Sequence, residues 1–522
     1  MKHIIYIALL VLFTACSDFL EDYSQDLVVP KTVSDLNEVL LGSGYLPSDI
    51  VKELRSGTIG WWLHILDDDI NMVMTYNAVK GFQDVNSTYY GYYTWQYEVG
   101  RNYDGTSLAG DNALWDGLYN RINAMNIILN ELGNVSQDSK QEQLDALTVQ
   151  GECLFLRAQF YLVLVNVYAN AYDPATAPST YGVPLKLTHY VEHDKNKDTQ
   201  FERTSVANVY AQIVDDLKIS IDCFKQSPQS RSFYRASEEA ARLLLSRVYL
   251  YMQDWTNARE AAKDFLAVKG DLYDYNSIAD STTVTISENS NEVLFSQGSL
   301  SLQSDFTGHG GDFCVSQDLY QLYDTLDCRR ELYFSRSYQS DSLGLWRKYE
   351  MGVHRSYVSD FWILRTAEGY LNMAEACAML DDPATASEYL NHLRRYRIDG
   401  YCDTIYSADN IVEAVREERR KELCFEGHRW FDLRRYAVCK KAPSKKVIKH
   451  MFSIYDWDHQ NLFKYGEVYL LEEDDLAYTF AIPKSVLEFD TGMPDNLREQ
   501  RKYSYLVYRK ADSGGDNEEE IE

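Results

Sequence analysis

Residues 416–436 read REERRKELCFEGHRWFDLRRY, and no other stretch of this length is as informative about the fold. Acidic side chains, a histidine and many arginines crowd around a Trp-Phe pair. The titratable candidates are Glu422, Glu426, His428 and Asp432. By composition alone the stretch is typical of an active site, so a catalytic role is the first hypothesis.

The spacing of the charges favours a structural role instead. Glu422 and Glu426 lie four residues apart, so their carboxylates would share one face of a helix. Two carboxylates can hydrolyse a glycosidic bond only if one of them is held protonated. Arg419 and Arg429 each lie three residues from one of these acids, and nearby guanidinium groups favour ionised carboxylates. Gly427 can end one helix before the aromatic pair packs the next. We therefore interpret the stretch as an ion-paired internal scaffold, with a glycoside hydrolase as the alternative.

The first 15 residues predict a lipoprotein signal peptide. Residues 4–15 are almost wholly apolar, shorter than the about 20 residues of a spanning helix but suited to a secretory signal. Small residues then precede Cys16, as lipoprotein signal peptidase requires. Cys16 is therefore predicted to carry acyl chains such as palmitate, which anchor a protein by about 0.8 kcal/mol per buried CH₂. Residues 16–29 are the expected lipidated tether. The alternative is an ordinary secretory signal cut near Ala15.

The overall composition narrows the possible ligands. The net charge is −28 with a pI of about 4.8, which argues against nucleic acid and against attraction to an anionic membrane surface. Residues 511–522 form an acidic tail. The chain has 41 Tyr beside 20 Phe. An excess of tyrosine favours half-wetted positions, where a ring can stack on a ligand while its hydroxyl keeps a partner. Sugars and peptides both suit such surfaces.

Helical periodicity predicts a mainly α fold built from helix pairs. The pairs are expected near residues 112–170, 205–267, 361–397 and 408–437, the third beginning with a helix over 361–380. Small residues and an Asp254-Trp255 turn give tetratricopeptide-like units, but irregular spacing disfavours a pure repeat array. We expect one domain over residues 30–510, with long loops and small strands inserted between the helices. Short β-like runs are predicted at 284–286, 291–295 and 478–482.

No metal or other cofactor is predicted. Residues 67–69 are three consecutive aspartates, and residues 194–198 begin like a calcium loop, but both lack the Gly and terminal Glu that such a loop needs. None of the eight cysteines after Cys16 forms a Cys-x-x-Cys pair, which argues against a zinc ribbon. Cys314 and Cys328 could pair in an exported loop, although the sequence does not settle connectivity.

A set of motifs in fixed order resembles the SusD/RagB family of outer-membrane nutrient-binding lipoproteins. In chain order they are Cys16-Ser-Asp-Phe-Leu20, Trp115-x-x-Leu-Tyr119, Gly151-Glu152-x-x-Phe155-Leu156-Arg157-Ala158, Tyr181-Gly-Val-Pro-Leu185, Ala240-Ala241-x-Leu243-Leu244, Leu364-Arg365-x-Ala367-Glu368 and residues 417–435. Each motif is weak alone, but their order covers most of the chain. The C-terminal pattern departs from the family, since only Ala481-Ile482-Pro483 remains of it.

The resemblance implies a SusD-like fold and a function. Such proteins sit on the cell surface, capture oligosaccharides or, in some members, peptides, and cap a TonB-dependent β-barrel transporter of the SusC type. They have no catalytic role. We therefore expect an outer-membrane lipoprotein that faces the cell exterior, serves polysaccharide utilisation, and binds an oligosaccharide. The alternatives are a peptide-binding member of the same family and a helical assembly lipoprotein without a small ligand.

The resemblance also draws the ligand surface from two insertions, near residues 45–111 and 270–360. Both are rich in aromatic residues that can stack on sugars. If residues 89–95 form a strand, about half of their rings should be core, because strand side chains alternate between faces. Any single ring here is more often core than ligand contact. The expected ligand-binding residues are Trp62, Asp69, Tyr89, Tyr90, Tyr103, Phe306 and Trp346.

Overall fold

The computed structural model describes residues 30–46, 61–72, 89–106, 110, 112–190, 197, 199–228, 232–279, 282–298, 302, 313–336, 343–349, 358–456, 462–508 and 519–521. Cys16 with the predicted signal peptide, the tether 16–29, Phe306, Asp194 and Asp198 lie outside these residues. Among the helices described here, none is both long and apolar enough to cross a membrane.

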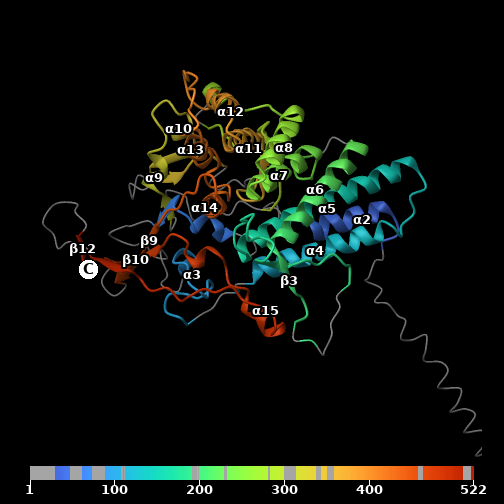
Figure 1. Ribbon diagram of the computed structural model, residues 1–522, viewed down its shortest axis with the longest axis horizontal. Helices are drawn as coiled ribbons and strands as arrows, with labels where there is room; N and C mark the ends of the chain where they lie inside the picture. The colour runs from blue at the N-terminus through green and yellow to red at the C-terminus, as the bar shows by residue number, and fades with distance from the viewer. Residues whose placement is uncertain are drawn as a thin grey trace, which may run out of the picture.

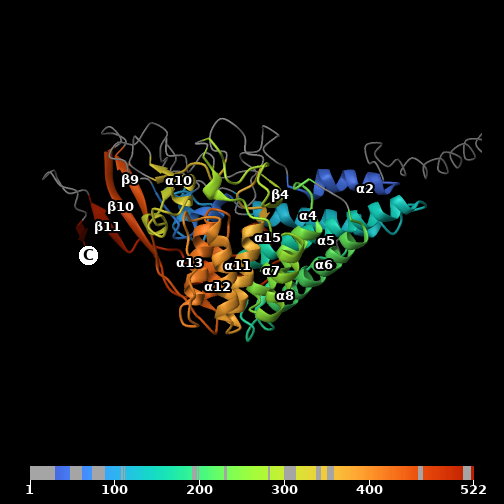
Figure 2. The same ribbon diagram turned by 90° about the horizontal axis from the view of Figure 1, so that it is seen from above.

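The body of the molecule is a row of antiparallel helix pairs, which confirms the mainly α prediction. Helix α5 packs between α4 and α6, α7 packs on α8, and α11 contacts α8, α12 and α13. Figure 1 shows this row, and Figure 2 shows α8 and α12 on the side opposite to α10 and β9. The helices are α2 Val33–Val39, α3 Tyr89–Tyr93, α4 Ala113–Glu131, α5 Lys140–Tyr168, α6 Val206–Gln226, α7 Glu238–Tyr251, α8 Trp255–Val268, α9 Gln317–Tyr320, α10 Arg329–Tyr333, α11 Thr366–Met379, α12 Pro383–Arg395, α13 Ile411–Leu423, α14 Arg429–Ala437 and α15 Lys484–Phe489.

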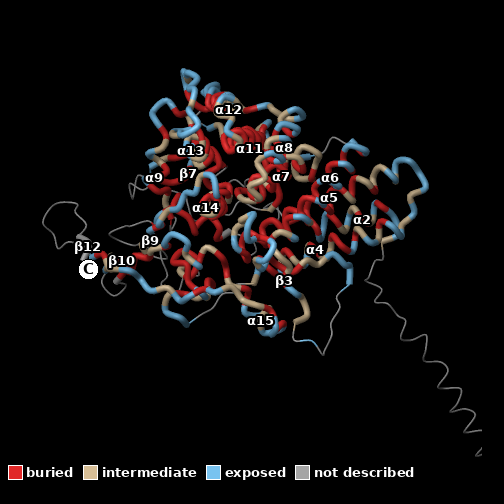
Figure 3. Tube along the Cα trace, viewed as in Figure 1, coloured by how far each residue is buried: buried red, intermediate tan, exposed pale blue. Residues whose placement is uncertain are grey.

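Side-chain caps set where these helices begin. The hydroxyl of Ser139 accepts from the backbone N–H of Glu142, whose carboxylate accepts in return, so α5 starts with a capping box. Asp254 caps α8 as the Asp-Trp motif predicts, and Asp382 caps α12 ahead of a proline. From Val149 onward nearly every residue of α5 is buried, which makes it the central helix (Figure 3).

The strands are short and lie in the insertions. They are β1 Ile70–Met72, β2 Tyr181–Pro184, β3 Arg203–Ser205, β4 Val293–Ser296, β5 Phe313–Val315, β6 Phe334–Arg336, β7 Leu343–Leu345, β8 Ile363–Arg365, β9 Ile448–Asp456, β10 Leu462–Leu471, β11 Tyr505–Tyr508 and β12 Glu519–Ile521. The hairpin of β9 and β10 is extended by β11 and then by β12, within the acidic tail. Strand β1 pairs antiparallel with β5, so the two insertions predicted to carry the ligand surface meet.

Several predicted elements differ from the structure. Helix α11 begins at Thr366, not at 361, because residues 363–365 pair with β4 as β8. Residues 89–93 form helix α3 in place of a strand, with Gly91 packed against a backbone carbonyl that a side chain would strike. Residues 476–478 form a 3₁₀ turn, so the strand predicted over 478–482 is wrong. The run 284–286 is not a strand, although Thr285 and Ile286 donate to backbone carbonyls of 347 and 348. The β9–β10 hairpin was not predicted.

Candidate functional site

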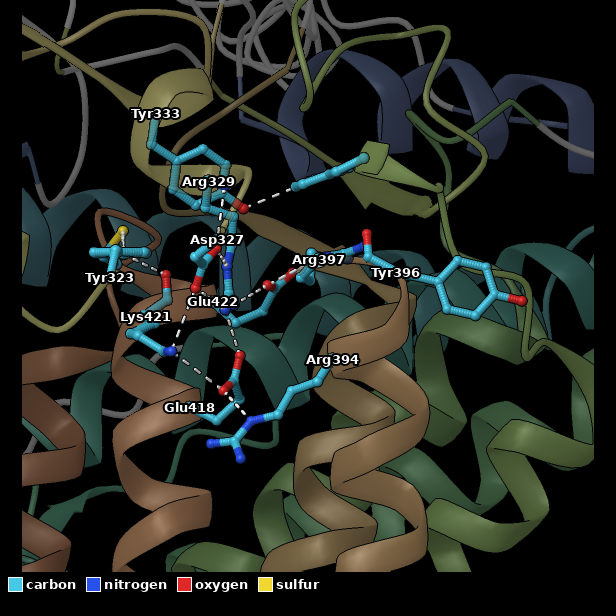
Figure 4. A network of polar contacts seen from close by, with 12 residues as sticks. Tyr323, Asp327, Arg329, Tyr333, Arg394, Tyr396, Arg397, Glu418, Lys421 and Glu422 are labelled. Carbon is cyan, nitrogen blue, oxygen red and sulfur yellow. Dashed lines mark hydrogen bonds and ion pairs between the residues drawn. The ribbon is translucent and has the colours of Figure 1, made fainter. Parts of the chain in front are cut away.

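Residues 416–436 lie largely inside the protein and contribute to an ionic core, part of which Figure 4 shows. At its centre is Glu422 on α13, which is fully buried. Arg329 donates to Oε2 of Glu422 at 2.7 Å, and Arg365 donates to Oε1 at 2.6 Å. Arg397 approaches both oxygens, at 2.9 to 3.1 Å. One carboxylate thus joins α10, β8 and the end of α12 to α13.

Four further carboxylates complete this network. Each lies at most 3 % exposed and forms ion pairs with arginine or lysine at 2.6 to 3.6 Å. The carboxylates are Glu292, Asp327, Glu418 and Glu426, and the additional cations are Lys348, Arg394 and Lys421. Because Glu292 and Asp327 belong to the 270–360 insertion, the network fastens that insertion to the helical body. This agrees with the scaffold interpretation.

The pKa shifts of Glu422 and Glu426 argue against a role as a catalytic acid pair. Burial would raise the pKa of Glu422, but Arg397, Arg365 and Arg329 outweigh burial and hold that pKa well below its usual range. Glu426 behaves alike, with Arg365 and Lys348 lowering its pKa against the effect of burial. A general acid of a glycosidase needs a raised pKa and access to the substrate. Neither carboxyl has either property.

Asp432 and His428 belong to a neighbouring part of the same core. Asp432 accepts from Arg419 at 2.9 Å and from Arg435 at 2.7 Å. Nδ1 of His428 lies 3.2 Å from a guanidinium nitrogen of Arg419. Burial, followed by the charges of the surrounding arginines, lowers the pKa of His428 well below 6.5, so its ring is neutral and accepts this hydrogen bond.

The three aspartates at 67–69 are a second ionic cluster, and their carboxylates lie within 4.8 Å of one another. Asp68 pairs with Arg429 and Lys446 at 2.7 Å and with Arg420 at 3.1 Å. Asp69 pairs with Arg420 at 2.7 Å and is 1 % exposed. Its carboxylate therefore locks the N-terminal insertion onto α13, and it is not accessible to a ligand.

Trp62, another expected ligand contact, lies in the core. Its ring packs against Tyr92 and Phe480, with centroid distances of 4.9 and 4.7 Å and nearly parallel planes, and those two rings also stack on each other at 6.3 Å. Only 5 % of the residue is exposed. Trp62 is therefore a core residue and offers almost no surface to a sugar.

Tyr89, Tyr90 and Tyr103 form a half-buried aromatic cluster against the β9–β10 hairpin. The Tyr103 hydroxyl donates to Glu467 at 2.8 Å, and its ring stacks on Phe452 at 5.4 Å. The hydroxyls of Tyr90 and Tyr469 lie 3.1 Å apart. Tyr89 packs edge-on against Phe313 of β5. The structure therefore brings these three rings together beside the second insertion, each with part of its surface open.

Trp346 is the most open of the expected residues, at 51 % exposed. It directly follows β7, and its backbone N–H donates to the carbonyl of Tyr333 at 2.8 Å, which fixes its position. Strand β7 packs on β5, and β5 carries the Phe313 ring that contacts Tyr89, so Trp346 follows a strand that neighbours the Tyr89 cluster. Nearby on this insertion, the guanidinium of Arg330 lies 4.6 Å from the ring centroid of Tyr320.

One concave region was missed by the sequence analysis. A pocket of about 660 Å³ lies between α4, the segment after β2 and helix α15. Its rings come partly from α4, which was predicted only as scaffold, and partly from residues 185–202. The sequence feature that could have indicated it is the presence of two large side chains, Leu187 and Tyr190, in a segment between predicted helices. In the structure both are more than 40 % exposed.

The cysteines that could have paired do not. Cys314 lies on β5 and Cys328 precedes α10, and both are free thiols. Burial raises the pKa of Cys314 to about 11, which keeps its thiol protonated and unreactive.

Comparisons with known proteins agree with this architecture. A family model described as SusD family matches residues 346–503, and one described as starch-binding associating with outer membrane matches residues 58–250. A SusD-like protein P25 of Formosa agariphila is 20 % identical, covering 83 % of this chain and 89 % of its own length.

Solved structures share the fold. A putative sugar binding protein of Bacteroides vulgatus is 23 % identical with a TM-score of 0.66, covering 90 % of this chain and 99 % of that one. A SusD superfamily protein of Bacteroides thetaiotaomicron is 20 % identical with a TM-score of 0.67, covering 90 % and 100 %. A surface glycan-binding protein A of Bacteroides fluxus is 20 % identical with a TM-score of 0.62, covering 91 % and 100 %.

Proposed function

Since the chain belongs to the SusD/RagB family, we propose that it binds an oligosaccharide at the outer membrane and delivers it to a TonB-dependent, SusC-like β-barrel transporter. In this proposal Cys16 carries the lipid anchor, and the chain faces the cell exterior. The relatives whose printed names mention sugar or glycan binding support the ligand class. The starch-binding, outer-membrane description of the family model supports the location.

The observation that carries the ligand-binding part is the exposed indole of Trp346, directly after a strand that packs on the β1–β5 pair joining the two insertions. Sugar rings present C–H groups that stack on an aromatic face, while their hydroxyls need neighbouring hydrogen-bond partners. Trp346 is held by its backbone at the end of β7, and 51 % of it is open. The half-open rings of Tyr89, Tyr90 and Tyr103 neighbour the same strand pair. A preformed platform of this kind binds without ordering a loop and suits release to a partner.

Trp346→Ala is expected to weaken binding of the oligosaccharide about tenfold, since loss of one stacking ring costs about 1–2 kcal/mol. The ligand is first identified with a glycan array and, in parallel, a peptide library, using the full-length lipoprotein in detergent. Affinity is then measured by calorimetry. Ile405→Ala is the matched control, because Ile405 is 88 % exposed and its chain neighbours Thr404 and Tyr406 are held by side chains of α12. Unchanged affinity in Trp346→Ala would show that Trp346 is not part of the site. Binding of peptides alone would show that the ligand is a peptide and not an oligosaccharide.

Mild detergent extraction of the outer membrane is expected to recover this protein in a complex with a large β-barrel protein. A lid on a transporter has to stay associated with it during loading, so the complex should survive gel filtration. The measurement is mass spectrometry of the co-purifying bands, with Cys16→Ser as a control that should leave the membrane fraction. Recovery of the wild-type chain without any barrel would count against delivery while leaving ligand binding untouched.

A further inference from the structure

The pocket beside α4 is separate from the face that carries Trp346. It is bounded by α4, by residues 184–190 from the end of β2 onward, by residues 200–202 before β3, and by residues of α15 and the segment after it. None of Tyr89, Tyr90, Tyr103 or Trp346 lines it. Its volume of about 660 Å³ falls within the range of ligand pockets, about 300–1,000 Å³.

The wall formed by residues 184–190 is fixed in place by hydrogen bonds to the helical body. The Tyr161 hydroxyl on α5 donates to the carbonyl of Lys186 at 2.8 Å and accepts from its backbone N–H at 2.7 Å. Asn126 on α4 donates to the same carbonyl at 2.9 Å. Tyr119 donates to the carbonyl of Pro184 at 2.8 Å. This wall therefore exists before any ligand arrives.

The opposite wall is fixed by one buried carboxylate. Asp490, at the end of α15, accepts from the backbone N–H of Gln200 at 2.7 Å and from that of Phe201 at 2.9 Å. Asp490 is fully buried, so these charge-assisted hydrogen bonds are shielded from water. They hold residues 200 and 201 against α15. The pocket is thus preorganised on both sides, which lowers the entropic cost of binding.

The lining combines aromatic rings with neutral amides. Its rings include Tyr119, Tyr190 and Phe201, and its amides are Asn120, Asn123 and Gln200. The buried Oδ1 atom of Asn123 has no hydrogen-bond partner within the part of the chain that the structure describes. A buried acceptor of this kind is costly unless a donor reaches it, so a small shift of the Asn123 amide toward the pocket would let it bind a sugar hydroxyl.

The charges of the pocket disfavour an ionic ligand. Lys186 and Glu202 are the charged residues that line it. The ammonium of Lys186 already donates to the carbonyls of Thr188 and Tyr190, at 2.6 and 2.9 Å. Among the residues that the structure describes, Lys186 is the one cation lining the pocket, so phosphate or carboxylate would have to compete with these carbonyls and with the charge of Glu202. A purely apolar tail would leave the amides without partners.

We propose that this pocket is a second carbohydrate site, which takes a neutral stretch of the same oligosaccharide chain or of a second one. The proposal rests on the proposed function and adds a location to it. Tyr190 and Phe201 would provide stacking faces, and the amides of Asn120 and Asn123 would bind hydroxyls. Two sites on one chain raise the effective concentration of a long glycan and would favour long chains over short ones.

The test uses the full-length lipoprotein in detergent and, as probe, the linear neutral oligosaccharide that scores highest on the glycan array, from disaccharide to octasaccharide. In Trp346→Ala a weaker binding event should remain by calorimetry. Adding Tyr190→Ala should weaken that residual event about tenfold. Tyr503→Ala, on a tyrosine of similar exposure outside the pocket, is the control and should leave it unchanged.

The outcomes separate the two proposals. If the wild type binds the glycan and Trp346→Ala abolishes all binding, the second site is overturned while the proposed function stands. If Tyr190→Ala and Asn123→Ala both leave the residual event unchanged, the second site is again overturned. If no glycan binds the wild type at all, the proposed function itself fails. Melting temperatures equal to wild type are expected for Tyr190→Ala, because half of its side chain is already in water.

Discussion

Replacing Glu422 by glutamine is expected to lower the free energy of unfolding by about 3–5 kcal/mol, the usual cost of removing one partner of a buried ion pair. Glutamine keeps the volume of the side chain but not its charge. Arg329, Arg365 and Arg397, which are fully buried or nearly so, would then share fewer carboxylates. The measurement is the midpoint of urea unfolding followed by circular dichroism.

Glu417→Gln is the matched control for this prediction. Glu417 lies on the same helix, α13, but is exposed to solvent, so its replacement should change stability by less than about 0.5 kcal/mol. Equal effects of the two variants would contradict the ionic-core assignment. The comparison also tests the hydrolase alternative, because a catalytic Glu422 would lose turnover in a variant that remains as stable as the wild type.

Acid is expected to unfold the protein in two stages. In the first stage His428 takes up a proton in the unfolded chain but not in the folded one, because its pKa in the folded state lies well below the ordinary 6.5. A group with a depressed folded pKa contributes stability that is complete above its unfolded pKa and is lost as the pH falls. Stability should therefore begin to decline below about pH 6.5, by up to about 1.4 kcal/mol per pH unit for one proton.

The second stage belongs to the buried carboxylates and should be the larger one. Below the ordinary values of 4.5 for Glu and 3.8 for Asp, the unfolded chain takes up protons that the folded chain resists, because arginines hold the folded pKa values down against burial. The carboxyls with a lowered pKa include Asp68, Glu375, Glu418, Glu422, Glu426 and Asp432. Burial and the neighbouring acids raise the pKa of Asp67, and burial raises that of Asp69, so these two offset a part of the loss.

Urea midpoints measured between pH 7 and pH 3 would test both stages. The difference between wild type and Glu422→Gln should shrink as the pH falls below the ordinary Glu value of 4.5, since the unfolded wild-type chain takes up a proton there that the folded carboxylate resists, whereas the glutamine does not titrate. Stability that is flat or rising from pH 7 down to pH 3 is the result that would rule out an ionised core. A pH-independent difference between the two proteins would show that Glu422 is not charged.

The ionic core attaches both insertions to the helical body. Arg329 on α10 is joined to Glu418 and Glu422 on α13, and Asp68 is joined to Arg429 at the start of α14. Buried, directional ion pairs therefore hold the same two insertions that carry Trp346 and the Tyr89 cluster.

For residues 416–436 the sequence predicted a scaffold role, but it did not predict which residues form the ion pairs. It indicated scaffold rather than catalysis from Arg419 and Arg429 near the two glutamates. In the structure Arg419 pairs with Asp432 and Arg429 with Asp68. The cations on Glu422 come from elsewhere: Arg329 is 93 residues away and Arg365 is 57. Helix spacing places side chains on a common face, but it does not say which distant element will cover that face.

The predictions for the ligand site show the same limit: the sequence indicated regions, but not which of their side chains are buried. Aromatic composition and the family resemblance pointed to two insertions, and the pairing of β1 with β5 brings these insertions together. Composition could not separate Trp62, which is buried against Tyr92 and Phe480, from Trp346, which is half exposed. Burial depends on what packs against a residue from outside its own segment, and for Trp62 one of those residues lies near the C-terminus.

The helix pairs, their caps and the chemical character of the block at 416–436 were determined by the sequence alone, because periodicity, capping and charge balance act over a few neighbouring residues. The partners of Glu422, the burial of Asp69 and the pocket beside α4 were decided only by the tertiary structure. Each of these depends on segments far apart in the chain, and their contact is fixed by how the helices and insertions pack together.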